Sequence, residues 1–337
     1  MIDAMKDSPK SAEAPAIRTA VVDCGTNMFS MLIADVSPLG WESKFILRRP
    51  VFLGQGGFQS RIIVPDRFAR GLDALRVLHQ AAVNYGVQEV RVVGTSALRD
   101  AMNGDVFARS VRKLLNWNLE IIDGEQEARW INEGVALTLS ASESPALVMD
   151  IGGGSVEFIL TKRKADGHWI VEDLVSLNVG VARLAEFGKP EDPLTSAGEE
   201  RYREFLEDAM APVRKMIASH PPVALVGSSG SFDTFSEMIN GPVPRNLAKD
   251  PTQIQTIEST AWKVLHERLI ETPVQGRLKL QGMAPDRARM IPLSSMLVNH
   301  IWRLLPADAR LIRSPFAMRE GVMNEIWQHL CNPMSQE

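Results

Sequence analysis

Residues 146–161 read Ala-Leu-Val-Met-Asp-Ile-Gly-Gly-Gly-Ser-Val-Glu-Phe-Ile-Leu-Thr, with Asp150 and a glycine cluster between two apolar runs. Apolar runs on both sides of a glycine cluster predict two buried strands joined by a tight turn. The same order occurs near the N-terminus, where Asp23 ends one apolar run and Gly25-Thr26-Asn27 separates it from the next. A motif repeated in this way predicts two similar lobes that face one cleft.

The composition is that of a globular protein with more than one domain. The chain has 337 residues, of which 45% are hydrophobic and 23% charged. A net charge of -4 argues against a general nucleic-acid binder, and no run of about 18 apolar residues predicts a membrane span. Cys24 and Cys331 lack disulfide or zinc-site spacing, so we expect a reducing, cytoplasmic setting. Residues 1–17 lack the apolar centre of a secretory signal and are predicted to be a disordered tail.

The predicted elements divide between an N-terminal lobe at 18–133 and a helix-rich C-terminal lobe at 134–337. In the first lobe we predict strands at 19–24, 29–36, 41–52, 89–93 and 119–122, and helices at 65–85, at 97–115 and from about 125. In the second lobe we predict strands at 146–150, 156–161 and 223–226, and helices at 197–219, 252–271, 286–305 and 318–329.

Glycines after a buried strand allow backbone N–H groups to surround a phosphate, because no Cβ stands in the way. A single turn of this kind is more often a simple hairpin, but three occur in this chain. The candidate substrate-binding residues are Gly25, Thr26, Asn27, Gly152, Gly153, Gly154, Ser155, Gly227, Ser228, Ser229 and Gly230.

Asp23 and Asp150 would repel a phosphate chain unless a divalent cation lies between them and it, so they imply magnesium. The alternative is that each carboxylate caps its own turn. Glu125 and Glu127 open a predicted helix, where acids also interact favourably with the helix dipole. They lie about 200° apart around the axis, so only one of them can face the cleft.

These motifs together resemble the exopolyphosphatase and guanosine pentaphosphate phosphohydrolase family. The resemblance runs from Val21 to about Ile326. It implies an α/β fold of two actin-like, ribonuclease H-like lobes with a cleft between them, as in sugar kinases and the large heat-shock chaperones. Its marks are Asp23-Cys-Gly-Thr-Asn27, Gly94-Thr-Ser-Ala-Leu-Arg99-Asp-Ala-Met-Asn103, Gly124-Glu-Gln-Glu127-Ala-Arg129, Asp150-Ile-Gly-Gly-Gly-Ser-Val-Glu157, Gly227-Ser-Ser-Gly-Ser231 and Met318-Arg-Glu-Gly321.

The resemblance also implies roles for particular residues. Glu127 matches the catalytic base that deprotonates water, and Arg99 matches an arginine that contacts the phosphates. Asp150 and Glu157 match acids that hold magnesium, with manganese as the alternative ion. These roles suit phosphoanhydride cleavage, which depends on positioning and charge neutralisation. Structural alternatives stay open for Arg99, paired with a neighbouring acid, and for Glu157, turned outward on its strand.

The function implied is magnesium-dependent release of terminal orthophosphate from inorganic polyphosphate, or of the 5′ γ-phosphate from guanosine pentaphosphate. The resemblance also implies a homodimer that binds polyphosphate or guanosine pentaphosphate and tetraphosphate. Two alternatives remain, an ATP-using kinase or ATPase of the same fold and a sensor that binds these ligands without catalysis.

The sequence departs from the family pattern at Met28, where a short polar residue is usual, and at Ser30, where a basic one is frequent. Longer members carry an additional helical domain with His-Asp motifs, so this chain resembles the short, two-domain form. The arginines near the end form either a polyphosphate track or a solvated face; they are Arg303, Arg310, Arg313 and Arg319.

Overall fold

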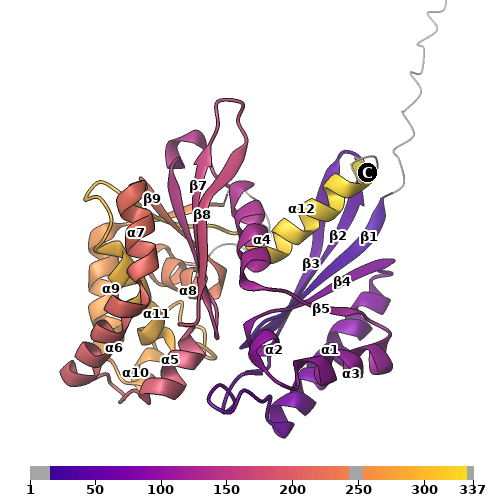
Figure 1. Ribbon diagram of the computed structural model, residues 1–337, viewed down its shortest axis with the longest axis horizontal. Helices are drawn as coiled ribbons and strands as arrows, with labels where there is room; N and C mark the ends of the chain where they lie inside the picture. Colours follow the sequence, from indigo (N-terminus) through magenta and orange to yellow (C-terminus); the bar gives the residue numbers. More distant parts are fainter. Residues whose placement is uncertain (1–15, 243–252, 332–337) are drawn as a thin grey trace, which may run out of the picture.

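The computed structural model describes residues 16–242 and 253–331. Most of the predicted tail at 1–17 therefore lies outside the described residues, and Ile17 already begins the first strand. Two sheets stand side by side, each with helices of its own (Figure 1). Within the described ranges, no helix combines the length and apolar character needed to cross a lipid bilayer.

The first sheet has the strand order β3-β2-β1-β4-β5. Three strands form an antiparallel meander, and β4 and β5 then run parallel to β1. Nearly every residue of β1 and β2 is buried or half-buried, which explains their continuous apolar sequences. The strands are β1 (Ile17–Cys24), β2 (Met28–Ser37), β3 (Gly40–Pro50), β4 (Glu89–Gly94) and β5 (Leu119–Ile121).

The second sheet repeats this order as β8-β7-β6-β9-β11, with β10 added at the edge. The register is repeated as well, because Asp23 lies opposite Ser30 in the first sheet and Asp150 opposite Glu157 in the second. The predicted two-lobed α/β fold is therefore confirmed. The strands are β6 (Ala146–Ile151), β7 (Val156–Arg163), β8 (Trp169–Leu177), β9 (Ala224–Ser228), β10 (Gln255–Ile257) and β11 (Arg310–Arg313).

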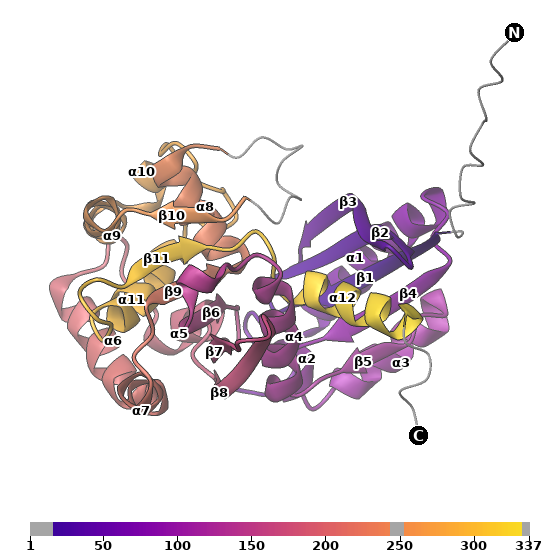
Figure 2. The ribbon, with the colours of Figure 1, turned by 90° about the horizontal axis from the view of Figure 1, so that it is seen from above.

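The helices cover the outer parts of both sheets (Figures 1 and 2). Those of the first lobe are α1 (Pro65–Asn84), α2 (Ser96–Asp100), α3 (Gly104–Leu115) and α4 (Gly124–Ala136), followed by the 3-10 turn η1 (Ala141–Glu143). The helices that follow are α5 (Val181–Gly188), α6 (Ser196–Ala209), α7 (Ala211–Ser219), α8 (Ser229–Asn240), α9 (Ser259–Glu271), α10 (Val274–Arg277), α11 (Ile291–Trp302) and α12 (Met318–Cys331).

Four helix predictions were wrong in detail, and one of them is the helix predicted at 286–305, which covers only Ile291–Trp302. The helix predicted at 97–115 is two, because Asn103 leaves the helix to pair with both backbone groups of Ile63. The helix predicted at 197–219 breaks at Met210, just before Pro212, which favours a first helical turn. In place of the helix predicted at 252–271, β10 precedes α9, and residue 252 lies outside the described residues.

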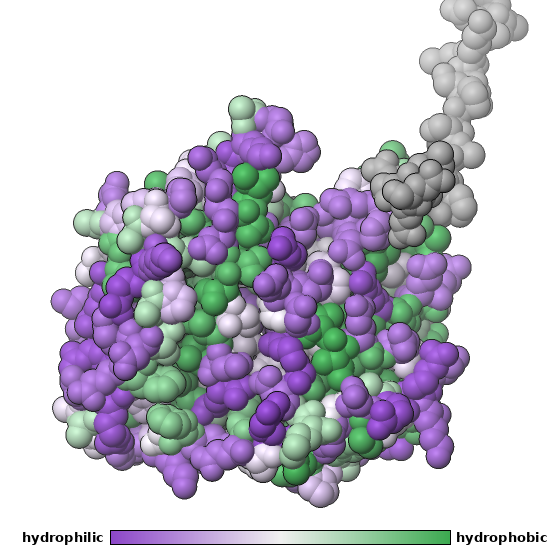
Figure 3. Space-filling model, in the orientation of Figure 1, coloured by the Kyte–Doolittle hydropathy of each residue, from purple (hydrophilic) through white to green (hydrophobic). Residues whose placement is uncertain are grey.

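Helices α4 and α12 pack against each other between the two sheets, as both ribbon views show (Figures 1 and 2). Their backbones meet at Gly134 and Gly321: a Cβ at Gly321 would lie 1.8 Å from the Trp130 carbonyl oxygen. A third hydrophobic core, with members from α4, α12 and both sheets, joins the lobes here. On the face in Figure 3, hydrophilic side chains cover most of the outer flanks, while hydrophobic ones gather nearer the middle.

Helix α12 follows the second sheet in sequence but packs on β1, β2 and β3 of the first. Helix α4 spans the predicted lobe boundary at 133/134. The chain therefore crosses twice between the lobes, and the boundaries themselves stay a prediction.

Candidate functional site

A cavity of about 170 Å³ lies between the lobes, where the glycine loops of both meet. Its wall includes carboxylates from β1, α4 and β6, so the two copies of the repeated motif face each other as predicted. The predicted site residues that line it are Asp23, Gly25, Thr26, Asn27, Glu127, Asp150, Gly152, Gly153, Gly154, Ser155, Ser229 and Gly230.

The two loops share one hairpin geometry. Gly25 N–H donates to the Met28 carbonyl at 3.1 Å, and Gly152 N–H donates to the Ser155 carbonyl at 3.0 Å. The loops also touch, because a Cβ on Gly153 would lie 2.8 Å from the Asn27 side chain. A Cβ at position 153 would displace the Asn27 side chain, so glycine is favoured where the second loop approaches the first.

The N-terminus of α5 holds the second loop from behind. Gly180, Val181 and Ala182 donate their N–H groups to the carbonyls of Gly154, Gly152 and Gly153 at 3.1, 3.1 and 2.8 Å. The loop's carbonyls are thus occupied. By contrast, the N–H groups at the tips of both loops (26–27 and 153–154) donate to no acceptor among the described residues. Unused N–H groups in loops that line a cavity are suited to bind an anion.

Four carboxylates stand near these loops: Glu127, Asp150 and Glu157 are buried, and Asp23 is half-buried. Burial raises the pKa of Asp23 to about 7, opposed by the Arg319 charge and reinforced by that of Asp150. Burial, and next the charge of Asp150, raise the pKa of Glu157 to about 7. Burial also raises the pKa of Asp150, although Ser228 Oγ donates to its Oδ2 at 2.7 Å. So many acids in one place are unfavourable unless a cation joins them.

Glu127 lies in the first turn of α4, whose N-cap is Asp123. It is buried, whereas Glu125 is exposed, so only one of the two faces the interior. Burial raises the pKa of Glu127 well above its usual range, and the nearby charge of Glu157 adds to this. Arg99 Nη1 donates to Glu127 Oε2 and to the Ile122 carbonyl, both at 3.0 Å. Arg99 therefore fixes the Glu127 carboxylate.

Four predicted residues are not among the described residues that line the cavity: Arg99, Glu157, Gly227 and Ser228. Glu157 lies beneath the cavity wall, 1% exposed, and accepts a bond from Ser176 Oγ at 2.8 Å. The third glycine segment is not a free loop, because Gly227 and Ser228 end β9 and Ser229 begins α8. Ser229 takes a left-handed φ of 65°, and its side chain lines the cavity.

Sequence reasoning missed two arginines that line the cavity, Arg48 in β3 and Arg287, which precedes α11. Of the four C-terminal arginines considered above, only Arg319 lines the cavity. Met28 and Ser30, the two departures from the family pattern, line it as well. The sequence pointed to Met28 and Ser30 only through their positions in the family motif.

The oxygen ligands fit magnesium. Among the described residues, no three acidic, histidine or cysteine side chains are already arranged around one point. Magnesium does not need such a cage, since it is usually held by one or two carboxylates, waters and substrate phosphates. Asp150 and Asp23, which line the cavity, and Glu157 behind it are the residues able to hold the ion.

Comparison with known proteins identifies relatives of the whole fold. The sequence profile of the Ppx/GppA phosphatase family matches residues 33–329. Guanosine-5′-triphosphate,3′-diphosphate pyrophosphatases of Aliivibrio fischeri and Vibrio atlanticus are each 27% identical, over 93% and 91% of this chain. The chain spans about 60% of the length of these relatives.

Solved structures give the same result. An exopolyphosphatase from Cytophaga hutchinsonii is 28% identical with a TM-score of 0.86, covering 92% of this chain and 98% of that one. A Ppx/GppA family member from Aquifex aeolicus is 25% identical with a TM-score of 0.76, covering 94% and 99%. The resemblance noted from the sequence and the actin-like fold that it implied are both confirmed.

Proposed function

This chain belongs to the Ppx/GppA phosphatase family, and from that membership we propose that it hydrolyses a terminal phosphoanhydride bond with the help of magnesium. The substrate class is inorganic polyphosphate or guanosine pentaphosphate. The observation that supports this most is the composition of one cavity wall, where Glu127, Asp23 and Asp150 stand beside unused N–H groups of both glycine loops.

Each group then has one task. The loop N–H groups bind phosphate oxygens, and Glu127 orients a water molecule and accepts its proton. Arg99 acts through Glu127, because its guanidinium holds that carboxylate in place. Magnesium, when bound by Asp150 and its neighbours, neutralises charge on the phosphates. The raised pKa of Glu127 makes it a better proton acceptor than an ordinary glutamate once it is ionised.

The two substrates share the chemistry of the bond that breaks, and the relatives carry both names. The curated relatives are named as guanosine-5′-triphosphate,3′-diphosphate pyrophosphatases, and one structural relative as an exopolyphosphatase. The exopolyphosphatase matches this chain with 28% identity and a TM-score of 0.86. We favour polyphosphate because of this likeness.

The test is phosphate release from inorganic tripolyphosphate, guanosine pentaphosphate and ATP, with and without magnesium. Glu127→Gln keeps the size of the side chain but accepts no proton, so we expect turnover to fall by about 10²–10⁴-fold with substrate binding retained. Glu125→Gln is the matched control from the same helix turn and should change little. Wild-type turnover in the Glu127 variant would remove it from the mechanism.

The same assay separates the alternatives. ATP hydrolysis or phosphate transfer in preference to the other substrates would favour an ATP-using enzyme, and binding without turnover would favour a sensor. We also propose a homodimer in the cytoplasm. Light scattering at micromolar concentration that gives the monomer mass would refute the dimer.

A further inference from the structure

Arg319 lies in the first turn of α12, and its side chain lines the cavity. The side chain is only 9% exposed. Nη1 has no hydrogen-bond partner among the described residues, and Nη2 makes only a long contact of 3.4 Å with Glu320 Oε1. A buried guanidinium with unused N–H donors is unfavourable without an acceptor. The geometry indicates that the acceptor is a ligand in the cavity.

Glu320 already has another partner. Its Oε2 accepts the N–H of Ala317 at 2.9 Å, which caps the start of α12. The carboxylate is thereby held at the helix end, and its remaining oxygen stays at the long distance from Arg319. The neighbouring acid therefore stabilises the helix more than it satisfies the guanidinium.

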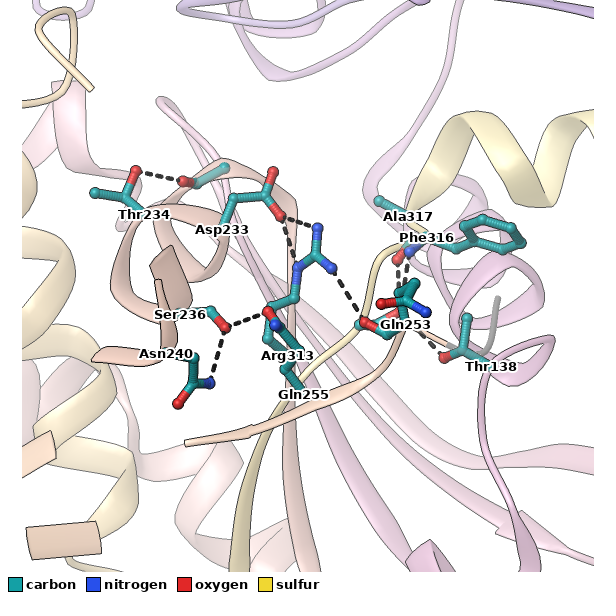
Figure 4. Close-up of polar contacts among 12 residues, drawn as sticks. Thr138, Asp233, Thr234, Ser236, Asn240, Gln253, Gln255, Arg313, Phe316 and Ala317 are labelled. Carbon is teal, nitrogen blue, oxygen red and sulfur yellow. Dashed lines mark hydrogen bonds and ion pairs between the residues drawn. The ribbon is translucent and has the colours of Figure 1, made fainter. Parts of the chain in front are cut away.

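The segment before α12 is fixed by polar contacts, shown in Figure 4. Arg313 in β11 donates from Nε and Nη2 to Asp233 Oδ1 at 2.9 and 2.7 Å. Ser314 Oγ accepts the Phe316 N–H at 3.2 Å and lies 3.2 Å from Thr138 Oγ1, just after α4. These contacts tie the segment that leads into α12 to α8 and to the turn after α4, so the start of the helix that carries Arg319 is fixed from both directions.

The other arginines near the site are differently engaged. Arg99 donates to Glu127 and to a backbone carbonyl, and Arg48 lies 3.5 Å from Asp233. Arg287 packs over Gly230, where a Cβ would lie 1.6 Å from its Nη2. Unlike Arg99 and Arg48, Arg319 has a buried Nη1 with no hydrogen-bond partner among the described residues.

We propose that Arg319 is a catalytic residue whose guanidinium donates hydrogen bonds to non-bridging oxygens of the terminal phosphoryl group. The proposal rests on the hydrolysis described above. In that step the water oxygen bonds to the terminal phosphorus, the bond from phosphorus to the bridging oxygen breaks, and the water's proton passes to Glu127. Arg319 keeps its protons and donates to the phosphoryl oxygens both in the bound substrate and in the transition state, where their charge is largest, so its loss lowers kcat and also weakens substrate binding.

Arg319→Ala should lower kcat for tripolyphosphate by about 10²–10³-fold. Low-millimolar guanidinium should restore part of that turnover, because it can occupy the space left by the side chain. Arg319→Lys keeps the charge without the planar fork, so its kcat should lie between those of the wild type and Arg319→Ala. Arg310→Ala is the matched control, since that side chain pairs with Glu143 away from the cavity. Melting temperatures verify that each variant is folded.

Unchanged kcat in Arg319→Ala would overturn the proposal, as would a loss that neither guanidinium nor Arg319→Lys relieves. A second arm measures tripolyphosphate binding by calorimetry in the Glu127→Gln background. Adding Arg319→Ala should weaken binding by about tenfold or more, and adding Arg310→Ala should not. If the wild-type protein hydrolyses no substrate, the proposed function fails. The binding arm then still decides: equal binding with and without Arg319 rules out the contact.

Discussion

Gly321→Ala tests the helix crossing that joins the lobes. The added Cβ would lie 1.8 Å from the Trp130 carbonyl oxygen and 2.9 Å from the Gly134 nitrogen, both of them backbone atoms that no rotamer change can move. The helices would have to separate by more than about 1 Å. Overpacking of this kind costs about 1–3 kcal/mol, and we expect the upper end here. Alanine's better helix propensity offsets about 1 kcal/mol, which leaves a loss of about 2 kcal/mol.

In a chain of 337 residues, a loss of that size corresponds to a melting temperature lower by about 3 °C, measurable by differential scanning calorimetry. Turnover should fall as well, because α4 carries Glu127 and α12 carries Arg319. Gln328→Ala on the exposed side of α12 is the control and should stay within about 0.5 kcal/mol. A Gly321→Ala protein that melts and turns over like the wild type would show that the helices tolerate separation.

Three further predictions concern charge and packing. Magnesium should raise the melting temperature more at pH 8 than at pH 6. The reason is that the pKa values of Asp23 and Glu157 are about 7 and the ion binds their ionised forms. In the Asp150→Asn variant, magnesium should no longer raise the melting temperature. Met28→Ser should raise polyphosphate kcat/KM by about tenfold, because a half-buried cavity residue gains a hydroxyl for phosphate; a lower melting temperature without that gain would refute it. His266 is buried, and burial lowers its pKa to about 4. The folded protein therefore holds this side chain neutral, and the free energy of unfolding is highest above pH 6.5. As the pH falls from 6.5 to 4, up to about 3 kcal/mol of this stability is lost. The stability difference between the wild type and His266→Gln should shrink over that range, and a constant difference would contradict it.

Much of the fold could be predicted because its central strands are buried on both faces. β1, β2, β6 and β7 lie within one or two residues of their predicted ends, since continuous apolar runs leave little ambiguity. β11 could not be found in this way. Its sequence begins and ends with arginine, and Arg313 is tolerated inside only because Asp233 pairs with it. The local sequence of a strand does not reveal that a charged partner, here Asp233, comes from a distant helix.

The candidate site, like the fold, could be predicted from the sequence only in part. Its glycines and acids stand in motifs, so the sequence could place Asp150 and Glu127 near one cleft. Arg287 carries no such local signal, because the chain has many arginines and only tertiary packing decides which of them line the cavity. Arg319 stands in the motif Met318-Arg-Glu-Gly321, but the sequence left open whether it faced the cleft or solvent. Arg99 shows the converse, since its motif position was clear but its bond to Glu127 depends on how α2 and α4 meet.

Because both lobes repeat one strand order and one register, the chain has the form of a twofold dimer fused end to end. The fused halves can no longer separate: α12 of the later half covers the sheet of the earlier one, so a cut between η1 and β6 would expose an apolar face on each fragment. Fusion also frees one half to diverge from the other. Where Glu157 faces Asp150, only Ser30 faces Asp23. The two halves therefore differ at matching positions: the second sheet has a pair of acids, Asp150 and Glu157, where the first has one acid and a hydroxyl, Asp23 and Ser30.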